Sequence, residues 1–415
     1  MKKIVILCPT QRDRRELGII SRENGYGHDH IFYGDNPRER LADFDPFLFL
    51  ETFEKDFREI AIDGIMGTHD YPGSLLASIL CERHGLTSIG IIANIICQNK
   101  YYSRMIQKEA VPRAVPGFTL VDPYDPGYSE LPGFPFFIKP VKSFFSIFAG
   151  RIDNQEQYEE YLSSFRRSGT GFSLALDRLM GKYSDLEPCG DHLLAEELMR
   201  GKQVTLEGYV YNKEVTFLGI TDSVMYPGTI SFMRFDHPSR IPAVAGNRMK
   251  EITEKVIPAA GIDNGMFNIE FFYDQITDDI KIIEVNPRMA SQFADLMEKV
   301  HGTNSYKIQV DMALGRKPRF EKDRGLHRCA SSFVLRSFED RRIRKIPGKK
   351  EINRVLEIFP DARIEVYGKK KALLSSELQD MQSYRYAVVN LGGDYLEDLK
   401  NKFTECREIL GFEFG

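Results

Sequence analysis

The chain has 415 residues, of which 42% are hydrophobic and 28% are charged. These are globular proportions, and the length predicts two or three domains that can each bury a core. The net charge of −4 excludes a strongly basic molecule built to bind nucleic acid or an anionic membrane. No apolar run reaches about 18 residues, so we expect no membrane-spanning helix. Six scattered cysteines without a CxxC pair predict reduced thiols and a cytoplasmic protein rather than a zinc cluster.

The first 95 residues alternate between strand and helix patterns, which predicts a parallel sheet in an N-terminal α/β domain. The expected strands are KIVILC (3–8), FDPFLFL (44–50), GIMGTHD (64–70) and TSIGI (87–91), and the expected helices are TFEKDFREIAI (52–62) and SLLASILCERHG (74–85). Gly85 is a typical helix stop. The first turn lacks the GxGxxG pattern, so no dinucleotide site is predicted, and Gly25-Tyr26-Gly27 is interpreted as a loop.

The rest of the chain predicts a middle domain over residues 96–320 and a small α+β domain over residues 321–415. The predicted middle elements are a helix (99–107), a proline- and glycine-rich looped region, a strand (135–143), three strands joined by turns (192–223) and a hairpin (265–288). After Gly315–Pro318 the composition shifts to short strands, basic turns and a helix at 395–412.

The hairpin ends in IIEVNPR, an apolar strand whose last residues include an acid, an amide and an arginine. Residues two apart on a strand share a face, so Glu284 and Asn286 point the same way. If the hairpin is centred on Thr277, Glu270 on the upstream strand lies directly opposite Glu284. Opposed like charges destabilise a sheet, and burial raises the cost.

A cation between these acids removes the repulsion. Two carboxylates and an amide oxygen are hard ligands that suit Mg²⁺ carrying nucleotide phosphates, with Mn²⁺ as an alternative. Arg288 can bind a phosphate or a carboxylate with two parallel hydrogen bonds. A surface hairpin with solvated acids is the alternative, and the flanking apolar residues disfavour it.

The EVNPR segment after NIEFFYD resembles the ATP-grasp superfamily, and the resemblance covers roughly residues 99–318. It implies an α/β chain in which a parallel-sheet half-domain precedes an ATP-grasp fold and a small α+β C-terminal domain. It also implies that Glu270, Glu284 and Asn286 hold magnesium. Arg288 would lie beside the phosphates and the reacting carboxylate as the catalytic residue.

The same resemblance assigns residues that bind ATP. Lys139 in FFIKPV matches a strand lysine that contacts the nucleotide, and Lys100 matches an earlier lysine that opens a helix, with Lys108 as a competitor. The family's glycine- and serine-rich loop over the phosphates is replaced by VKSFFSIFAGR, in which Ser143 and Ser146 are candidate donors. This departure predicts either a stiffer loop or phenylalanines that cover an apolar substrate or pack in the core.

The segment LLAEELMRG resembles the stretch that holds the adenine. Glu196, Glu197 and Leu198 are the matching residues, with hydrogen bonds mostly from the backbone. Gln203 stands where the family often has a glutamate for the ribose, and Glu207 is a less regular alternative.

The resemblance implies a ligase that joins a small carboxylate to an amine through an acyl phosphate, with an amino acid as the favoured substrate class. No protein nucleophile is required. Partners are then small molecules rather than nucleic acid or membrane. A homodimer is also possible, because members of the superfamily often dimerise. Further candidates for substrate contacts, each equally interpretable as structural, are His69, Asp70, Ser291, Gln292 and His301-Gly302-Thr303.

Other functions fit the same residues. A thiol nucleophile or bicarbonate as the acid would change the products, and a regulator could bind ATP without turnover. The intact acid–acid–amide set favours an enzyme over a regulator. The basic turns at Lys349-Lys350 and Lys369–Lys371 could mark a nucleic-acid patch, although nearby acids favour a solvated surface.

Overall fold

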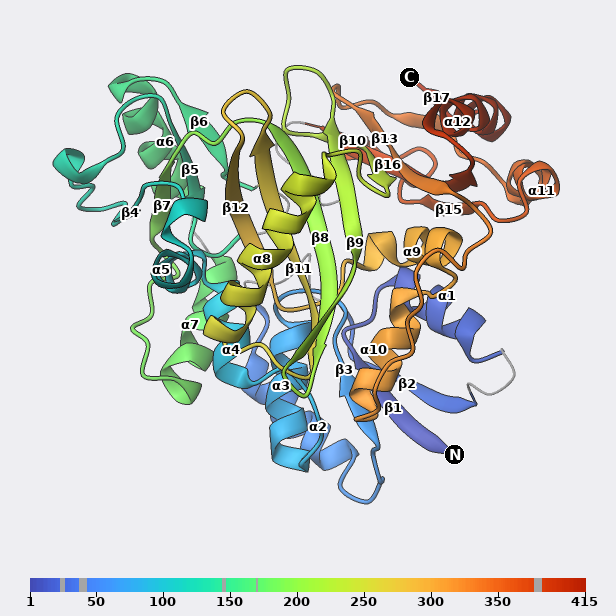
Figure 1. The fold of residues 1–415 in the computed structure, drawn as a ribbon, viewed down its shortest axis with the longest axis horizontal. Coiled ribbons are helices and arrows are strands. Elements are labelled where there is room, and N and C mark those ends of the chain that lie inside the picture. Colours follow the sequence, from blue (N-terminus) through green and yellow to red (C-terminus); the bar gives the residue numbers. More distant parts are fainter. Residues whose placement is uncertain (23–26, 37–42, 144–146, 169–170, 377–382) are drawn as a thin grey trace.

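The protein is described from a computed structural model, in which the central antiparallel sheet separates an N-terminal α/β layer from the C-terminal helices (Figure 1). The structure describes residues 1–22, 27–36, 43–143, 147–168, 171–376 and 383–415. The loop predicted at Gly25-Tyr26 lies outside these residues. Among the described residues, none of the helices combines the length and the apolar composition that crossing a bilayer requires.

The N-terminal part is a three-stranded parallel sheet in the order β2-β1-β3 with helices around it. Its elements are β1 (Lys2–Leu7), α1 (Gln11–Ile20), β2 (His28–Tyr33), α2 (Pro46–Asp56), β3 (Gly64–Met66), α3 (Gly73–His84) and α4 (Ile91–Gln98). The predicted parallel sheet is therefore confirmed. Gly85 ends α3 in the left-handed conformation, with φ of 63°, which explains the glycine at that position.

Two of the predicted strands in this part are wrong. The segment FDPFLFL begins α2, because the side chain of Asp45 accepts hydrogen bonds from the backbone amides of Phe47 and Leu48 and Pro46 takes the first helical position. The segment TSIGI forms no strand, and α4 starts at its last residue. The third strand is instead β2, HDHIFY, whose polar residues hid it from the hydrophobic pattern.

A small antiparallel sheet follows, in the order β4-β7-β5-β6. It contains β4 (Phe118–Val121), β5 (Phe136–Pro140), β6 (Gly150–Ile152) and β7 (Leu193–Glu197), and its helical segments are α5 (Lys100–Ala110), η2 (Pro112–Ala114), η3 (Tyr128–Glu130), α6 (Gln155–Ser168) and α7 (Gly171–Tyr183). The helix predicted at residues 99–107 is α5, which Asn99 caps by accepting from the amides of Tyr101 and Tyr102.

The largest sheet has eight antiparallel strands in the order β12-β11-β8-β9-β10-β13-β16-β15. Its strands are β8 (Lys202–Tyr211), β9 (Glu214–Met225), β10 (Phe232–His237), β11 (Gly265–Asp274), β12 (Asp279–Asn286), β13 (Cys329–Ser337), β15 (Arg363–Val366) and β16 (Tyr384–Gly393). The hairpin predicted at 265–288 is β11–β12. Its register pairs Glu270 with Glu284, as predicted, and a bulge follows directly.

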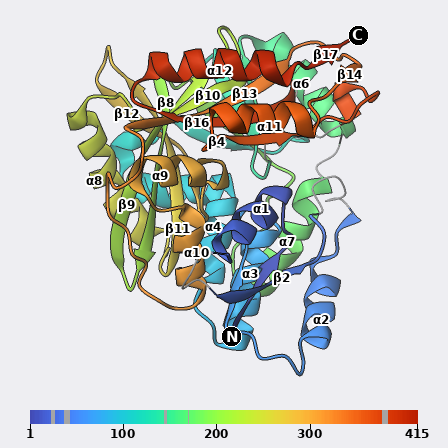
Figure 2. The same cartoon turned by 90° about the vertical axis from the view of Figure 1, so that its right-hand side faces the viewer.

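The remaining elements lie around this sheet. They are α8 (Ala243–Ala259), η4 (Ser291–Phe293), α9 (Ala294–His301), α10 (Ser305–Ala313), β14 (Ile343–Lys345), α11 (Lys349–Ile358), η5 (Leu374–Ser376), α12 (Leu396–Leu410) and β17 (Glu413–Phe414). Figure 2 shows α11 and α12 on the outer side of the C-terminal strands, away from the N-terminal helices. Because β13, β15 and β16 extend the sheet of the middle region, the proposed division into three domains stays a prediction.

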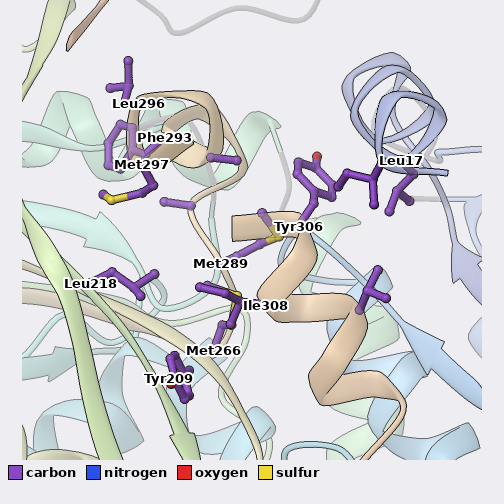
Figure 3. Close-up of a cluster of buried hydrophobic side chains, with 14 of the residues drawn as sticks. Leu17, Tyr209, Leu218, Met266, Met289, Phe293, Leu296, Met297, Tyr306 and Ile308 are labelled. Atoms are coloured by element: carbon purple, nitrogen blue, oxygen red, sulfur yellow. The ribbon is translucent and has the colours of Figure 1, made fainter. Parts of the chain in front are cut away.

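One core cluster joins the N-terminal region to the inner face of the large sheet (Figure 3). Tyr209 and Leu218 from the sheet pack with Met289, Met297 and other apolar residues of the segment that follows β12. Burial of this apolar surface is the dominant force that holds the two parts together. It also fixes the segment after β12, which carries Arg288, against the N-terminal α/β layer.

Candidate active site

The two acids of the hairpin face each other on the inner side of the large sheet. Glu270 on β11 pairs with Glu284 on β12, and Gln203 on β8 donates to Oε2 of Glu270 at 2.8 Å. Burial, followed by the charge of Glu284, raises the pKa of Glu270 to about 7. Burial also acts to raise the pKa of Glu284, but Lys100 and Lys139 outweigh it and hold this pKa below its usual value. The acids thus share one site in which a single proton or cation relieves their repulsion.

Lys100 lies against these acids at the first position of α5. Its Nζ is 2.9 Å from Oε1 of Glu284, and it donates to the carbonyl of Ser143 at 3.1 Å. The competing Lys108 is exposed, with its ammonium 5.6 Å from the ring centroid of Phe118. Lys100 is therefore the lysine of this helix that the fold brings to the candidate site.

Lys139 belongs to a buried triad of charges. Oε2 of Glu196 is 2.8 Å from Nζ of Lys139, and Oε1 accepts from Nε of Arg104 at 2.6 Å. Arg104 also donates to the carbonyl of Ile283 at 2.8 Å, one residue before Glu284. Burial lowers the pKa of Lys139, and Glu196 opposes this shift. Arg104 was missed in the sequence, although it lies one helical turn after Lys100.

Asn286 and Arg288 are held by a short chain of polar contacts at the end of β12. The Asn286 amide donates to Oδ1 of Asn268 at 3.0 Å, and its own oxygen accepts from Arg288 at 3.4 Å. Asn268 in turn donates to the backbone carbonyl of Arg288 at 3.0 Å. These contacts turn the Asn286 oxygen toward the side on which Arg288 lies.

Asp70 from the N-terminal sheet holds Arg288. Both oxygens of Asp70 accept from Arg288, through Nε and Nη2, at 2.9 Å each. Burial opposes ionisation of Asp70, but Arg288 outweighs it and keeps its pKa well below the usual value. The carboxyl end of β3 therefore contributes directly to the site, as expected for the ends of parallel strands.

The remaining predicted nucleotide residues take varied positions. The hydroxyl of Ser143 donates to the carbonyl of Ile147 at 2.8 Å, and Ser146 lies outside the described residues. Glu197 is exposed and accepts from the amide of Gly117 at 2.8 Å. Leu198 follows directly after β7.

Glu207, the alternative ribose residue, lies inside the fold. Its Oε1 accepts from the amide of Ala290 at 2.8 Å, and burial raises its pKa to about 8. Glu207 is buried and accepts from the backbone after Arg288, so it is poorly placed to contact a ribose. Gln203, which contacts Glu270, is the better placed of the two candidates on β8.

The other candidates for substrate contacts are spread over several places. Ser291 accepts from Arg12 at 3.3 Å, and Gln292 donates to Ser332 at 3.1 Å. Nε2 of His301 lies 2.9 Å from Nε2 of a second buried histidine, in a contact separate from the hairpin acids. Of this group, Asp70 is the residue that the described contacts connect to the charged cluster around the hairpin, through Arg288.

Lys142 is a further residue of the site that sequence reasoning missed. It follows β5 by two residues, is 5% exposed and donates to Oε1 of Gln98 at 3.0 Å. Burial lowers its pKa to about 8, and the charges acting on it belong to Asp70, Lys100, Glu284 and Arg288. Its signal in the sequence was a second lysine three residues after Lys139 in IKPVK.

The donor set fits a magnesium ion that is bound together with phosphates. Glu270, Glu284 and Asn286 carry oxygen donors on two paired strands, and a cation would relieve the repulsion between the two acids. Within the described ranges, no group of three or more His, Cys, Asp or Glu side chains could hold a metal alone. A site of two carboxylates and an amide would therefore be completed by phosphate oxygens and water.

Comparison with known proteins identifies one domain within the chain. Residues 132–296 match the model of the ATP-grasp domain. The large chain of carbamoyl phosphate synthase from Caldanaerobacter subterraneus subsp. tengcongensis is 29% identical over 157 residues. This match covers 33% of the present chain and 14% of the relative, so the chain spans only about a seventh of the length of such relatives.

Solved structures match over the whole chain. The L-amino acid ligase from Bacillus licheniformis superposes with a TM-score of 0.73 at 16% identity, covering 100% of this chain and 99% of the other. Phosphoribosylglycinamide synthetase from Anaerococcus prevotii has a TM-score of 0.68 at 15% identity, with 100% of both chains covered. Biotin carboxylase from Campylobacter jejuni has a TM-score of 0.66 at 13% identity, covering 100% of this chain and 92% of the other. At these identities the likeness shows the fold.

Proposed function

We propose that this chain, whose residues 132–296 match the ATP-grasp domain, joins a small carboxylic acid to an amine while converting ATP to ADP and phosphate. The observation that carries the proposal is the pair Glu270 and Glu284, held face to face between Lys100, Lys139 and Arg288. Two acids surrounded by cations suit a metal-bound triphosphate next to a second anion.

In this proposal the cations bring two anionic reactants together. Lys100 and Lys139 bind phosphate oxygens and offset their charge, while Glu270, Glu284 and Asn286 would hold magnesium, which would supply further positive charge to the phosphates. The carboxylate of the acid attacks the γ-phosphate and displaces ADP, which gives an acyl phosphate. The amine then attacks the acyl carbon and displaces phosphate. Positioning and charge stabilisation supply the rate enhancement, so no protein nucleophile is needed.

Arg288 has a defined place in this scheme. Asp70 accepts from Nε and Nη2 of the guanidinium, and Nη1 donates to the carbonyl of Met289 at 3.3 Å. The second hydrogen of Nη1 is the donor that we assign to a substrate oxygen. A planar arginine held in this way can stabilise the charge that develops on the transferring group. The amino acids are the substrate class we favour, because the L-amino acid ligase is among the structures that cover the whole chain.

Bicarbonate is the second candidate for the acid. Biotin carboxylase and the carbamoyl phosphate synthase large chain are among the similar proteins. The same cluster of cations suits this smaller anion equally well, so the products must separate the two reactions.

The proposal is tested by measuring ADP release with magnesium and ATP against a grid of paired amino acids, small acids and bicarbonate, with mass spectrometry of the products. We expect ADP release that depends on one acid–amine pair and a product lighter than the pair by one water. Glu284→Gln is the inactive reference, and Lys108→Met is the matched surface control that retains activity.

Two results would contradict the ligase. Release of ADP with bicarbonate alone as the acid would favour the carboxylase-type reaction. Binding of ATP without turnover across the grid, equal in wild type and Glu284→Gln, would indicate a regulator.

A further inference from the structure

Lys142 differs from the other cations of the candidate active site in how its charge is neutralised. Lys100 contacts Glu284, Lys139 contacts Glu196, and Arg288 contacts Asp70, each at 2.9 Å or less. Lys142 forms no such ion pair within the described part of the chain. Its hydrogen bond goes instead to the neutral amide oxygen of Gln98.

The surroundings of Gln98 fix this arrangement. The amide nitrogen of Gln98 donates to Oγ of Ser74 at 3.0 Å and to the side-chain oxygen of Asn94. Asn94 itself donates to Ser78 at 3.1 Å. Because the nitrogen is occupied by α3 and α4, the oxygen of Gln98 must face Lys142. The ammonium is thereby held in one place by a buried network of neutral groups.

A buried ammonium without a carboxylate partner is costly. Lys142 is 5% exposed, and removing a charge from water is unfavourable unless an opposite charge lies in contact with it. An ammonium has three donors, and the Gln98 oxygen accounts for one of them. No other acceptor among the described residues contacts the remaining two donors, and these donors and the buried charge both favour a bound anion.

The position of Lys142 identifies the anion. The charges that act on it are those of Asp70, Lys100, Glu284 and Arg288, which surround the place where phosphoryl transfer is proposed. In the proposed function Lys100 and Lys139 bind the nucleotide and Arg288 binds the acid, so Lys142 lies among charges assigned to both reactants. The segment after β5 has few glycines, which would let its backbone amides approach a phosphate closely. A fixed cation can replace those amides in binding the phosphate.

We propose that Lys142 is a catalytic residue that binds the γ-phosphate of ATP. After transfer it remains bound to the same phosphoryl group in the acyl phosphate. This inference rests on the proposed function, because it requires phosphoryl transfer at this site. It predicts that Lys142 discriminates between nucleotides: it contacts ATP through the γ-phosphate and makes no contact with ADP.

The test compares the binding of two nucleotides to full-length wild type and Lys142→Met by isothermal titration calorimetry with magnesium. The probes are ADP and a non-hydrolysable ATP analogue with an imido bridge between its β- and γ-phosphates. We expect the variant to lose about 10- to 100-fold in affinity for the analogue, since one hydrogen bond to a charged group is removed, and less than about 3-fold for ADP. Lys142→Arg should recover part of the loss.

Two controls separate this role from a structural one. Lys108→Met removes an exposed lysine and should leave both affinities unchanged. Lys142→Met removes a buried charge that lacks a carboxylate, so the nucleotide-free variant should melt at a higher temperature than wild type. A residue that merely supports the fold would give a lower melting temperature and equal losses for both nucleotides.

The outcomes distinguish the inference from the function on which it rests. If wild type binds both nucleotides and Lys142→Met leaves the affinity for the analogue unchanged, or weakens both nucleotides equally, the role of Lys142 is overturned. If wild type binds neither nucleotide, the proposed ligase function itself is overturned, together with the role of Lys142.

Discussion

Glu207 illustrates what burial does to a single acid in this fold. Its side chain is 1% exposed, and its Oε2 has no hydrogen-bond partner in the described residues. Burial raises the pKa to about 8, against the hydrogen bond from Ala290 and the charge of Arg288. A raised pKa means that the folded state prefers the neutral acid, while the unfolded state ionises near pH 4.

We therefore predict that the free energy of unfolding of wild type falls between about pH 5 and pH 8 by on the order of 2–4 kcal/mol more than that of Glu207→Gln. The sign follows because the unfolded chain loses its proton first, so raising the pH favours unfolding. Urea denaturation across this pH range measures the difference. Parallel pH profiles for the two proteins would show that Glu207 is already ionised in the fold.

Glu270 gives a second prediction at the scale of one residue. Its pKa is raised to about 7, so at pH 8 the metal-free protein holds two ionised acids side by side. Glu270→Gln removes that repulsion and should raise the stability of the metal-free protein at pH 8 by about 1 kcal/mol. Glu284 remains in place as the partner of Lys100.

The same variant should lose the stabilisation that magnesium and ATP give to wild type. Thermal melts with and without magnesium and ATP measure both effects. An equal shift on ligand addition in wild type and Glu270→Gln would exclude Glu270 as a metal ligand. Asp274→Asn, on the same strand but outside the cluster, is the matched control.

At the scale of elements, Arg104 connects three of them. It lies on α5 and reaches Glu196 on β7 and the carbonyl of Ile283 on β12, with 2% of its surface exposed. Loss of one partner of a buried ion pair leaves an uncompensated charge. The triad thus fixes the distance between the small sheet that carries Lys139 and the strand that carries Glu284.

Arg104→Met should lower the free energy of unfolding by about 3–5 kcal/mol, because Glu196 loses a partner and the Ile283 carbonyl is left unsatisfied. Chemical denaturation with Met105→Ala, an exposed neighbour on the same helix, as the control measures this. A loss below about 1 kcal/mol for Arg104→Met would mean that Lys139 alone is enough to compensate the buried charge of Glu196.

The hairpin and the N-terminal strands show what the sequence can reveal about elements. The pairing of Glu270 with Glu284 was predictable, because period-two alternation and a short polar turn leave few registers. The helix that FDPFLFL begins was not predictable, because a continuous apolar run of this length fits a strand or a buried helix. The cap at Asp45 favours the helix.

The residues of the site also fall into those that a local sequence pattern predicts and those that it does not. Lys100 and Arg288 follow from local pattern and lie in the cluster, although their roles stay predictions. Lys142 contacts Gln98, 44 residues earlier in the chain, and Asp70 contacts Arg288, 218 residues later. Their places in the site depend on these contacts between distant segments.

At the scale of the whole molecule, ion pairs tie the first helix to the C-terminal strands. Arg12 and Arg15 on α1 both contact Glu365 on β15, and Arg12 binds it with two hydrogen bonds of 2.7 Å. Burial opposes ionisation of Glu365, but Arg12 and then Arg15 outweigh it and keep its pKa well below the usual value. This contact links residues 353 positions apart.

A double-mutant cycle with Arg12→Met and Glu365→Gln should give a coupling energy of about 1–3 kcal/mol at pH 7. A depressed pKa means that this contribution is present above about pH 4 and is lost as the pH falls toward the pKa of the folded state. Coupling that is absent at pH 7, or independent of pH down to acid unfolding, would show that the contact contributes no net stability.

The continuity of the eight-stranded sheet limits how the chain can be divided. β10 pairs on one side with β9 and on the other with β13, which lies beyond residue 320. A protein shortened at that boundary would carry an open strand edge, with unpaired amides and carbonyls beside an apolar face, and such edges recruit other chains into aggregates. Recombining the C-terminal part with another protein would therefore require a strand of matching register to close that edge.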